Sequence, residues 1–398
     1  MQRVLQVVNI MDRGGVETLL MNIYRKVNRE SIQFDFLTHP YDQDYSYEYE
    51  SEILSMGGQI YKAPSFSQNP HDYQTYIEDF FRNHPEYTVI HAHNLDSASL
   101  VYMREAKKSG RYLIAHSHNT NDHGGRLKRQ MLQICHHIVR RYPDHFYACS
   151  KQAAEFAFGK KIASSCNCEI FYNGIDLARY CVNEIEHNTA RKKLSLDVDG
   201  PVFGTVGRLL SQKNHTFLLD VFAAILRREP SSILIIVGKC DLRTTLERKA
   251  KDLGISQHVH FACSVPNVPD YLKAFDVFLF PSLYEGLGMA AVEAQACGLP
   301  TLMSDEVPSL AACTDLAEFI SLSADAEKWA DESLRAYRES IGHRSDRIEQ
   351  VRDAGFDINE IAKKLCFFYN NHNSNLFSLE FYFLYLNYSR GVLWSNIK

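Results

Sequence analysis

The sequence predicts an α/β protein of two doubly wound domains, each a parallel β-sheet with helices on both faces. Short, continuous apolar runs alternate with longer amphipathic stretches along most of the chain. Strands buried on both faces have this unbroken apolar pattern, and the helices between them make the sheet parallel. The scheme starts again near residue 200, after a polar stretch of mixed charge at 176–200. We therefore expect two sheets that face one cleft and are joined by a linker.

The expected strands fall into two groups. In the first half they are Val4–Ile10, Phe34–Thr38, Gln59–Tyr61, Thr88–His91, Tyr112–His116, His145–Ala148 and Glu169–Tyr172. In the second half they are Val202–Val206, Ile233–Val237, Val259–Ala262, Val277–Phe280, Thr301–Met303 and Phe319–Leu322. The helical patterns include Glu17–Val27, Ser97–Lys108, Thr216–Arg227, Thr244–Leu253, Val268–Phe275 and Ala290–Cys297. These ranges give a first domain at 1–175, a linker at 176–200, a second domain at 201–368 and an aromatic tail at 369–398.

Composition and charge exclude several classes of protein. Apolar residues make up 45% and charged residues 23% of the 398 residues, as in ordinary globular proteins. The formal net charge is −5, so no basic field points to nucleic acid. The ten cysteines lack the spacing of a disulfide framework, so we expect free thiols in a cytoplasmic protein. The first residues lack a signal-peptide pattern, and no run approaches the ~20 apolar residues of a membrane span.

A Gly-Gly pair follows the first expected strand, in the stretch NIMDRGGVETLL. Gly14 and Gly15 would open the next helix, and without Cβ atoms they let backbone amides approach an anion or a sugar. A tight strand-to-helix turn without a ligand gives the same pattern. The pair matches neither a full G-x-G-x-x-G nor a Walker loop, so alone it is a weak indication of a ligand.

A second motif, GTVGRLLSQKN at 204–214, follows the first strand of the second half. Gly207 ends the strand, and Arg208 and Lys213 flank a short loop. Ligands of doubly wound sheets bind beyond the carboxyl ends of the strands. Two cations there suit a diphosphate, because arginine clamps phosphate oxygens with paired hydrogen bonds and lysine adds a compact charge. The alternative is a solvated basic loop.

The stretch SLYEGLGMAAVEAQACGLP at 282–300 places two glutamates around a glycine-spaced turn. The turn at Gly286–Gly288 leads into a helix whose first amides lack partners and carry partial positive charge. Glu285 would stand before the helix and Glu293 inside it. Since a carboxylate can accept hydrogen bonds from two vicinal hydroxyls, Glu293 would hold a ribose and Glu285 a hexose. The alternative is a helix-dipole partner at 285 and a surface residue at 293.

The segment EGLGMAAVE resembles the E-x7-E signature of retaining, nucleotide-sugar-dependent glycosyltransferases of the GT-B fold. It is similar in particular to family 4 members that build bacterial capsular and exopolysaccharides. The surrounding stretch DVFLFPSLYEGLGMAAVEAQACGLPTLMSD follows the family pattern, and GTVGRLLSQKNHTFLLDVF, FYNGIDL and NIMDRGGVETLL match in the same order. The resemblance covers roughly residues 1–368. It implies two Rossmann-like domains with the active site in the cleft between them.

The resemblance also implies roles for the matching residues. Arg208 and Lys213 would neutralise the donor diphosphate, Glu285 would contact the donor hexose, and His118 would end a strand near the transfer centre. The implied donor-binding residues are Glu293, which takes the ribose hydroxyls, Gly286, Leu287, Gly288, Met289, Gly15, Ser264 and Val265, the last two in a uracil platform read by backbone groups. The acceptor side is expected at Gly14, Asn173 and His93. The family varies at Leu287 and Met289, which leaves the sugar open.

We expect neither a metal nor another cofactor, with the nucleotide sugar bound as substrate. Cations and helix amides can stabilise the charge that develops on the leaving diphosphate. The D-x-D strings at 42–44 and 197–199 fall in expected loops, away from strand ends. Two H-x-H motifs, at 91–93 and 116–118, put histidines on one face of neighbouring strands, where they could hold zinc. We favour a polar cleft wall at His93 and His118, with His91 and His116 mostly packing.

The tail, SNLFSLEFYFLYLNYSRGVLWSNIK, does not resemble the family. It follows a helical stretch, INEIAKKLCFFY, of the kind that in the family often reaches back to the first domain. Three alternatives stay open for the tail. It packs on the first domain, lies in a membrane interface through Phe381, Phe383 and Trp394, or is an extension without order.

The expected function is that of a retaining hexosyltransferase in surface polysaccharide synthesis. It would move a hexose or amino-hexose from a UDP-sugar to a saccharide acceptor carried on a lipid. We expect a cytoplasmic protein, with peripheral association at the inner face of the cell membrane. The alternatives are a nucleotide-sugar-binding regulator without turnover and a GT-B epimerase. A phosphorylase would need pyridoxal phosphate on a lysine, for which the sequence has no convincing motif.

Overall fold

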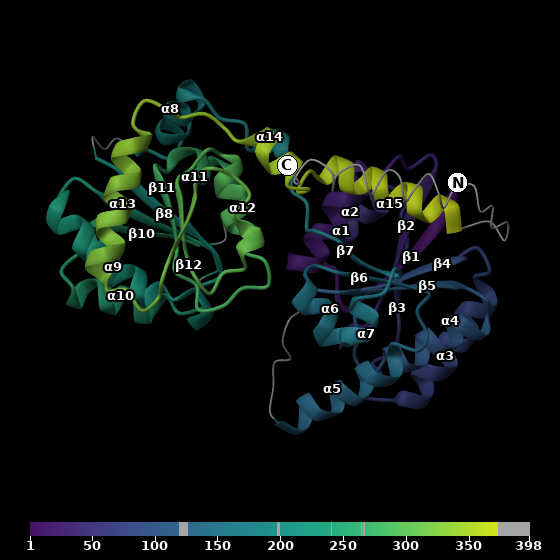
Figure 1. The fold of residues 1–398 in the computed structure, drawn as a ribbon. Helices are drawn as coiled ribbons and strands as arrows, with labels where there is room; N and C mark the ends of the chain where they lie inside the picture. Colours follow the sequence, from purple (N-terminus) through teal and green to yellow (C-terminus); the bar gives the residue numbers. More distant parts are fainter. Residues whose placement is uncertain (119–125, 197–199, 240, 264, 266, 373–398) are drawn as a thin grey trace.

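The computed structural model describes residues 1–118, 126–196, 200–239, 241–263, 265 and 267–372. They form two α/β units, each built on one parallel sheet, which Figure 1 shows side by side. The predicted fold class, two doubly wound domains, is confirmed. The residues outside this description include Ser264 of the expected uracil platform, the D-x-D string at 197–199 and residues 373–398 of the expected tail.

The first sheet has the strand order β3-β2-β1-β4-β5-β6-β7. Its strands are β1 (Gln2–Val8), β2 (Ile32–Thr38), β3 (Ile60–Lys62), β4 (Val89–Ala92), β5 (Tyr112–Ser117), β6 (His145–Ala148) and β7 (Cys168–Ile170). The helices between them are α1 (Gly15–Lys26), α2 (Glu50–Ser55), α3 (Pro70–Asn83), α4 (Ser99–Lys108), α5 (Arg126–Val139), α6 (Lys151–Phe158) and α7 (Lys160–Ala163). Because β1 and β4 are neighbours in mid-sheet, the loops that follow them meet at the point where the winding reverses.

The second sheet repeats this plan, with the strand order β10-β9-β8-β11-β12-β13. Its strands are β8 (Val202–Val206), β9 (Ile233–Val237), β10 (Val259–Ala262), β11 (Val277–Phe280), β12 (Thr301–Ser304) and β13 (Ala317–Ile320). Its helices are α8 (Glu184–Lys193), α9 (His215–Arg228), α10 (Arg243–Asp252), α11 (Val268–Ala274), α12 (Met289–Ala296), α13 (Ala326–Ser340) and α14 (Ile348–Asp353). Here β8 and β11 meet where the winding reverses.

Each sheet is buried on both faces, as a parallel sheet between two helix layers requires. Strand β1 illustrates the alternation. Val4 and Val8 belong to the apolar layer that includes α1, whereas Leu5 and Val7 belong to the layer that includes α3 and α4. Gln6 is fully buried on the same face as Val4 and Val8. The polar side chain of Gln6 therefore needs a partner inside the protein.

The last helix among the described residues, α15 (Ile358–His372), packs on the first unit rather than the second. Its apolar face, which includes Ile361, Leu365 and Phe368, lies in the core layer under α1, and Figure 1 shows the helix lying across that unit. The chain passes between the units twice, and the two passing segments pair at Ile175. Its amide donates to Phe356 O at 2.8 Å, and its carbonyl accepts from Ile358 N at 3.0 Å. The expected second domain, 201–368, therefore includes part of a helix that packs on the first unit. This return to the first unit is what the family resemblance implied.

The expected linker at 176–200 is mostly part of the second unit. Leu177, Tyr180 and Val182 lie in that unit's apolar core. Helix α8 follows, and Arg191 on it makes an ion pair with Asp276 at the start of β11. The polar composition of this stretch gives no indication of its packing, because a few well-spaced apolar side chains are enough to hold it against the sheet.

The expected strands all occur, several with shifted ends. The largest differences, two residues at each end, are in β1, expected at Val4–Ile10 and found at Gln2–Val8, and in β13, expected at Phe319–Leu322 and found at Ala317–Ile320. One thiol also differs from expectation. Eight described cysteines are free, but Cys263 is disulfide-bonded. Within the described part of the chain, no helix has both the length and the apolar character to cross a lipid bilayer.

Candidate functional site

The loops after β8 and β11 are joined at the carboxyl edge of the second sheet. The amide of Leu283 donates to Gln212 O at 2.8 Å, and Gln212 Nε2 donates to Tyr284 O at 2.9 Å. These two bonds connect segments that are about seventy residues apart in the chain. The predicted residues Lys213 and Glu285 come directly after this junction, so the backbone itself holds them next to each other.

Lys213 and Glu285 form a partly buried ion pair. Lys213 Nζ lies 2.7 Å from Glu285 Oε1, and the two side chains are 17% and 8% exposed. The ammonium also lies 4.7 Å from the centroid of the Phe280 ring. Gly207 makes room for the lysine stem, since a Cβ at Gly207 would stand 3.0 Å from Lys213 Cε. The pair places one positive and one negative group at the switch point where doubly wound sheets bind ligands.

Arg208 belongs to the same loop but does not join this pair. Its side chain is 59% exposed, and its guanidinium lies 3.3 Å from the Asp241 carboxylate. An exposed pair of this kind contributes little stability, so a ligand phosphate can compete for the guanidinium. The structure thus places one predicted cation inside the site and the other on its rim.

The turn into α12 offers backbone groups rather than side chains. Gly288 has φ +89°, and a Cβ there would lie 3.2 Å from Val307 Cγ1, so this position needs glycine. Leu287 turns its side chain into the apolar core and is 5% exposed. Nothing lies within 4 Å of a Cβ built at Gly286. With Met289 half-buried at the start of α12, the first-turn amides are the groups a ligand can reach.

Glu293 is half-buried in α12 and has an internal partner, the hydroxyl of Tyr180. Burial raises the pKa of Glu293, while the Tyr180 hydrogen bond and the positive charge of Arg179 act in the opposite sense. Glu293 is therefore not held against Glu285 or Lys213 by any contact in the described residues. Its predicted role toward a ribose stays a prediction, as does that of Val265, which is half-buried beside the same core.

The Gly-Gly turn of the first unit is covered by a carboxylate. Gly14 is the N-cap of α1, and a Cβ there would come within 2.1 Å of Glu17 Oε2. Gly15 has nothing within 4 Å of a built Cβ. Burial raises the pKa of Glu17. The turn can therefore approach a ligand at Gly15, with the Glu17 carboxyl group beside it.

Four histidines lie together at the carboxyl ends of β4 and β5. His93 Nδ1 is 2.9 Å from His118 Nε2, and the rings of His116 and His118 stack with centroids 4.0 Å apart. His91 stacks on His116 with centroids at 5.3 Å. Burial lowers the pKa of all four imidazoles, that of His118 to about 3. Each ring is therefore neutral near pH 7 and carries one proton.

The histidine cluster also has the spacing of a metal site. One ring nitrogen from each of His91, His93 and His116 lies within 4.8 Å of the others. However, both nitrogens of His93 are already in hydrogen bonds, to Gln6 and to His118. These contacts support the polar wall that the sequence favours over zinc.

Asn173 and Gly174 lie where the chain passes between the units. A Cβ at Gly174 would stand 2.5 Å from Ile361 Cδ1 and 2.9 Å from Ile358 Cα, so α15 packs directly on this glycine. Asn173 Oδ1 is buried and has no hydrogen-bond partner among the described residues. The carbonyl oxygen of Asn173 is thus available to a hydroxyl, in line with its expected place on the acceptor side.

The predicted residues therefore gather in two groups, one at each switch point. Lys213 and Glu285 are in contact in the second unit, and His93 and His118 are in contact in the first. Across the described ranges, no hydrogen bond or ion pair connects one group with the other. Their convergence on one ligand remains a prediction.

The sequence analysis missed four side chains that lie beside predicted residues: Glu17 beside Gly14, Tyr180 beside Glu293, Gln6 beside His93, and Tyr369, whose hydroxyl lies 2.5 Å from His91 Nδ1. Glu17 had a signal, because it is the third residue of its helix, where a capping-box glutamate folds back. Gln6 had one too, as a polar residue inside an apolar strand. The two tyrosines had none, since their partners are far away in the chain.

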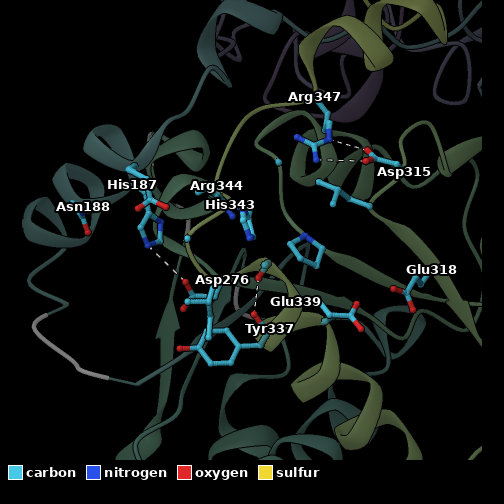
Figure 2. Close-up of a pocket in the computed structure, with 18 residues that line it drawn as sticks. His187, Asn188, Asp276, Asp315, Glu318, Tyr337, Glu339, His343, Arg344 and Arg347 are labelled. Carbon is cyan, nitrogen blue, oxygen red and sulfur yellow. Dashed lines mark hydrogen bonds and ion pairs between the residues drawn. The ribbon is translucent and has the colours of Figure 1, made fainter.

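The second unit also has a cavity of about 390 Å³ at the opposite edge of its sheet. It is lined by residues that precede the strands, including Asp276 before β11 and Pro300 before β12. Figure 2 shows two ion pairs at this cavity, His187 with Asp276 and Arg347 with Asp315. Because it lies at the amino ends of the strands, this cavity is not the predicted site.

Two doubly wound units with polar or charged groups at both switch points define the class of two-domain transferases called GT-B. The solved structure of HepE from Anabaena in complex with UDP has this fold. It superimposes with a TM-score of 0.74 at 19% identity, covering 93% of this chain and 100% of HepE. The likeness at this identity concerns the fold alone.

The chain belongs to the family 4 glycosyltransferases, and the predicted family is confirmed. The family model "Glycosyl transferases group 1" matches residues 186–353, and "Glycosyltransferase Family 4" matches residues 13–179. The protein EpsF of Bacillus subtilis, named as a glycosyltransferase, is 30% identical over 93% of this chain and 96% of its own length. An Escherichia coli relative is named UDP-Gal:alpha-D-GlcNAc-diphosphoundecaprenol alpha-1,3-galactosyltransferase. It is 33% identical over 33% of this chain and 35% of its own length.

Proposed function

We propose that this glycosyltransferase moves a hexosyl or amino-hexosyl group from a UDP-sugar to a lipid-linked saccharide, with retention, in surface polysaccharide synthesis. The observation that carries the proposal is the contact between Lys213 and Glu285 at the switch point of the second sheet. The names of the relatives support the choice of donor and acceptor. HepE was solved with UDP, and the E. coli relative is named for a UDP-sugar and a diphosphoundecaprenol acceptor.

The diphosphate is held by charges already at the site. In the absence of a ligand, Glu285 offsets the charge of Lys213 at 2.7 Å. A diphosphate brings more negative charge than one carboxylate, so the ammonium turns to it and leaves Glu285 free to accept hydrogen bonds from sugar hydroxyls. Arg208 on the rim and the first-turn amides of α12 add further donors. Binding of the diphosphate to Lys213 thus frees the Glu285 carboxylate to bind the sugar.

The transfer step needs no nucleophile from the protein. The bond between the anomeric carbon and the β-phosphate oxygen breaks, and the acceptor hydroxyl oxygen bonds to that carbon on the same face. The acceptor proton passes to the leaving phosphate oxygen. Lys213 stabilises the charge that grows on the diphosphate, which is the largest electrostatic task of the reaction. His118, neutral because of burial, hydrogen-bonds to the sugar without adding charge.

The proposal includes neither a metal nor another cofactor, because Lys213, Arg208 and the α12 amides supply the positive charge that a metal would supply elsewhere. The acceptor is a lipid-linked saccharide at the inner face of the cell membrane, where the protein binds peripherally. We infer no nucleic-acid partner from a chain of net charge −5.

Thermal unfolding with a panel of nucleotides tests the donor. UDP and one or more UDP-sugars should raise the Tm, since a ligand at a hundred times its Kd stabilises by about 2.7 kcal/mol. GDP and ADP serve as matched controls, and each is measured with and without EDTA. Stabilisation by GDP alone would refute the uridine donor, and a UDP effect that EDTA abolishes and a divalent ion restores would refute the metal-free account. Transfer to a lipid-linked acceptor, with the new anomeric configuration read by NMR, tests retention.

A further inference from the structure

Five side chains, four of them buried and His118 half-buried, form a continuous series of hydrogen bonds from helix α15 to the candidate transfer centre. Tyr369 on α15 lies 2.5 Å from His91 Nδ1, and Gln6 Nε2 lies 3.3 Å from the Tyr369 oxygen. Gln6 Oε1 is 2.9 Å from His93 Nε2, and His93 Nδ1 is 2.9 Å from His118 Nε2. Gln6 and Tyr369 are fully buried, and His91 and His93 are at most 9% exposed.

The positions of the protons along this series of hydrogen bonds depend on one another. A neutral imidazole has one N–H and one bare nitrogen, and an amide has one donating and one accepting end, so each link fixes the next. The link between Tyr369 and His91 sets the direction, because a phenol is a better donor than a neutral imidazole and an imidazole nitrogen is the better acceptor. The Tyr369 hydroxyl therefore donates to His91 Nδ1, and its oxygen accepts from Gln6.

The remaining protons follow in order. Gln6 gives its N–H to Tyr369 and turns its oxygen to His93, so His93 Nε2 carries the proton and donates. His93 Nδ1 is then bare and accepts from His118 Nε2–H. This leaves His118 Nδ1 without a proton. That atom is buried and has no hydrogen-bond partner among the described residues.

We propose that Gln6 and Tyr369 are positioning residues that hold His118 in its Nε2–H tautomer, so that His118 Nδ1 accepts a hydrogen bond from a hydroxyl of the bound sugar. The tautomer follows from the geometry of these five side chains alone, whereas the use of His118 Nδ1 rests on the proposed transferase function. The assignment gives α15 a task in the active site. The helix comes after the second unit in the chain, yet its tyrosine orders a histidine of the first.

A spectroscopic test needs no substrate. In protein labelled with ¹⁵N-histidine, two-bond correlations between ring protons and nitrogens distinguish Nε2–H from Nδ1–H, and His118→Gln identifies the His118 signals. The wild type should show Nε2–H at His118. Tyr369→Phe removes the hydroxyl that orients Gln6, so His118 should become a mixture of tautomers. Gln6→Leu, which removes the amide from a fully buried position, should do the same and serves if Tyr369→Phe fails to fold.

Tyr112→Phe is the matched control. Tyr112 on β5 packs its ring on Phe368 and His372 of α15, so the variant also loses a hydroxyl beside this helix, but one outside the chain of five. Its His118 signals should match those of the wild type. An Nδ1–H tautomer in the wild type would overturn the proposal, as would an unchanged His118 in folded Tyr369→Phe. Stoichiometric zinc in the purified protein would overturn it too, because the metal would take a His93 nitrogen that the chain uses.

Activity separates this inference from the proposed function. Tyr369→Phe should lower kcat for sugar transfer about tenfold, the loss expected for one active-site hydrogen bond, with the donor KM within twofold. Tyr112→Phe should keep the wild-type kcat. If the wild type transfers no sugar but shows the Nε2–H tautomer and its loss in Tyr369→Phe, the proposed function fails and the positioning chain stands. If kcat for Tyr369→Phe equals that of the wild type, the catalytic use of His118 Nδ1 is refuted.

Discussion

At the scale of single residues, the charge pair between Lys213 and Glu285 makes the ligand-free site nearly neutral. The side chains are at most 17% exposed and 2.7 Å apart, so each offsets the other with little screening by solvent. Removing one partner of such a pair leaves the other charge unpaired. The two possible single substitutions therefore should not act alike, although both break the same contact.

We expect opposite effects on nucleotide binding from these two substitutions. Glu285→Gln leaves the Lys213 charge unopposed, so UDP should bind more tightly while turnover falls, because the sugar loses its carboxylate. Lys213→Ala should weaken UDP binding and lower turnover more than tenfold, since a charge-assisted phosphate contact contributes about 1.5–3 kcal/mol. Calorimetric titration of UDP and initial rates check both.

Lys251→Ala, an exposed lysine on α10 of the same unit, is the control and should behave as the wild type. Weaker UDP binding in both site variants would mean that the pair serves folding rather than the diphosphate. Activity of Lys213→Ala within twofold of the wild type would remove this lysine from the mechanism.

Residue types at the site were predictable, but their partners were not. Lys213 and Glu285 stand in motifs that the family shares, so both could be named from the sequence. The hydrogen bond between Tyr180 and Glu293, and that between Gln6 and Tyr369, join segments more than a hundred residues apart. No local pattern contains such a pair, because the fold alone decides which distant side chains meet.

At the scale of elements, strands were the easiest to predict. A strand buried on both faces must be apolar throughout, and this makes it visible in the sequence. The expected ends of edge strand β13 were two residues too late, because its residues are only partly buried and include Glu318, so its apolar pattern is weaker. Helix α15 was visible as an amphipathic pattern, but a pattern does not say which sheet its apolar face will cover.

Gly174 is an element-scale position at which we expect any side chain to destabilise the protein. Gly174→Ala would push its Cβ against Ile361 and the backbone of Ile358, which must shift to make room. Overpacking of this kind costs about 1–3 kcal/mol, so the Tm should fall by several degrees and α15 should become easier to cleave by protease.

Gly15→Ala is the control for stability, because nothing lies within 4 Å of a Cβ there and the residue is the first of α1. Alanine should leave the Tm unchanged or slightly raised. An unchanged Tm and unchanged proteolysis in Gly174→Ala would show that α15 is not tightly packed on this segment.

At the scale of the whole molecule, buried neutral histidines make both units sensitive to acid. Burial lowers the pKa to about 3 for His118 and to about 4 for His145 in the first unit, and to about 4 for His215 in the second. In an unfolded chain a histidine has a pKa near 6.5. Between these values the unfolded chain takes up protons that the folded protein refuses, so stability falls as the pH drops below about 6.5.

Each of these histidines should cost about 1.4 kcal/mol of stability on going from pH 7.5 to pH 5.5. Glu293, whose pKa is raised by burial, acts in the opposite sense. Thermal unfolding in buffers of equal ionic strength checks the effect, and the Tm should decrease steadily below pH 6.5. A Tm that is constant from pH 7.5 to pH 5.5 would contradict the burial of neutral imidazoles.

The sequence by itself determined the α/β class, the strands of both sheets, several of the helices between them, and the motifs that surround Lys213 and Glu285. These are local properties, because apolar periodicity and glycine spacing act within a few residues of the chain. Only the tertiary structure decided that the stretch after Ile175 belongs to the second unit and that Tyr369 on α15 reaches His91 and Gln6. The physical reason is that burial rewards any apolar face that finds a partner, and the choice among partners depends on the shape of the whole chain.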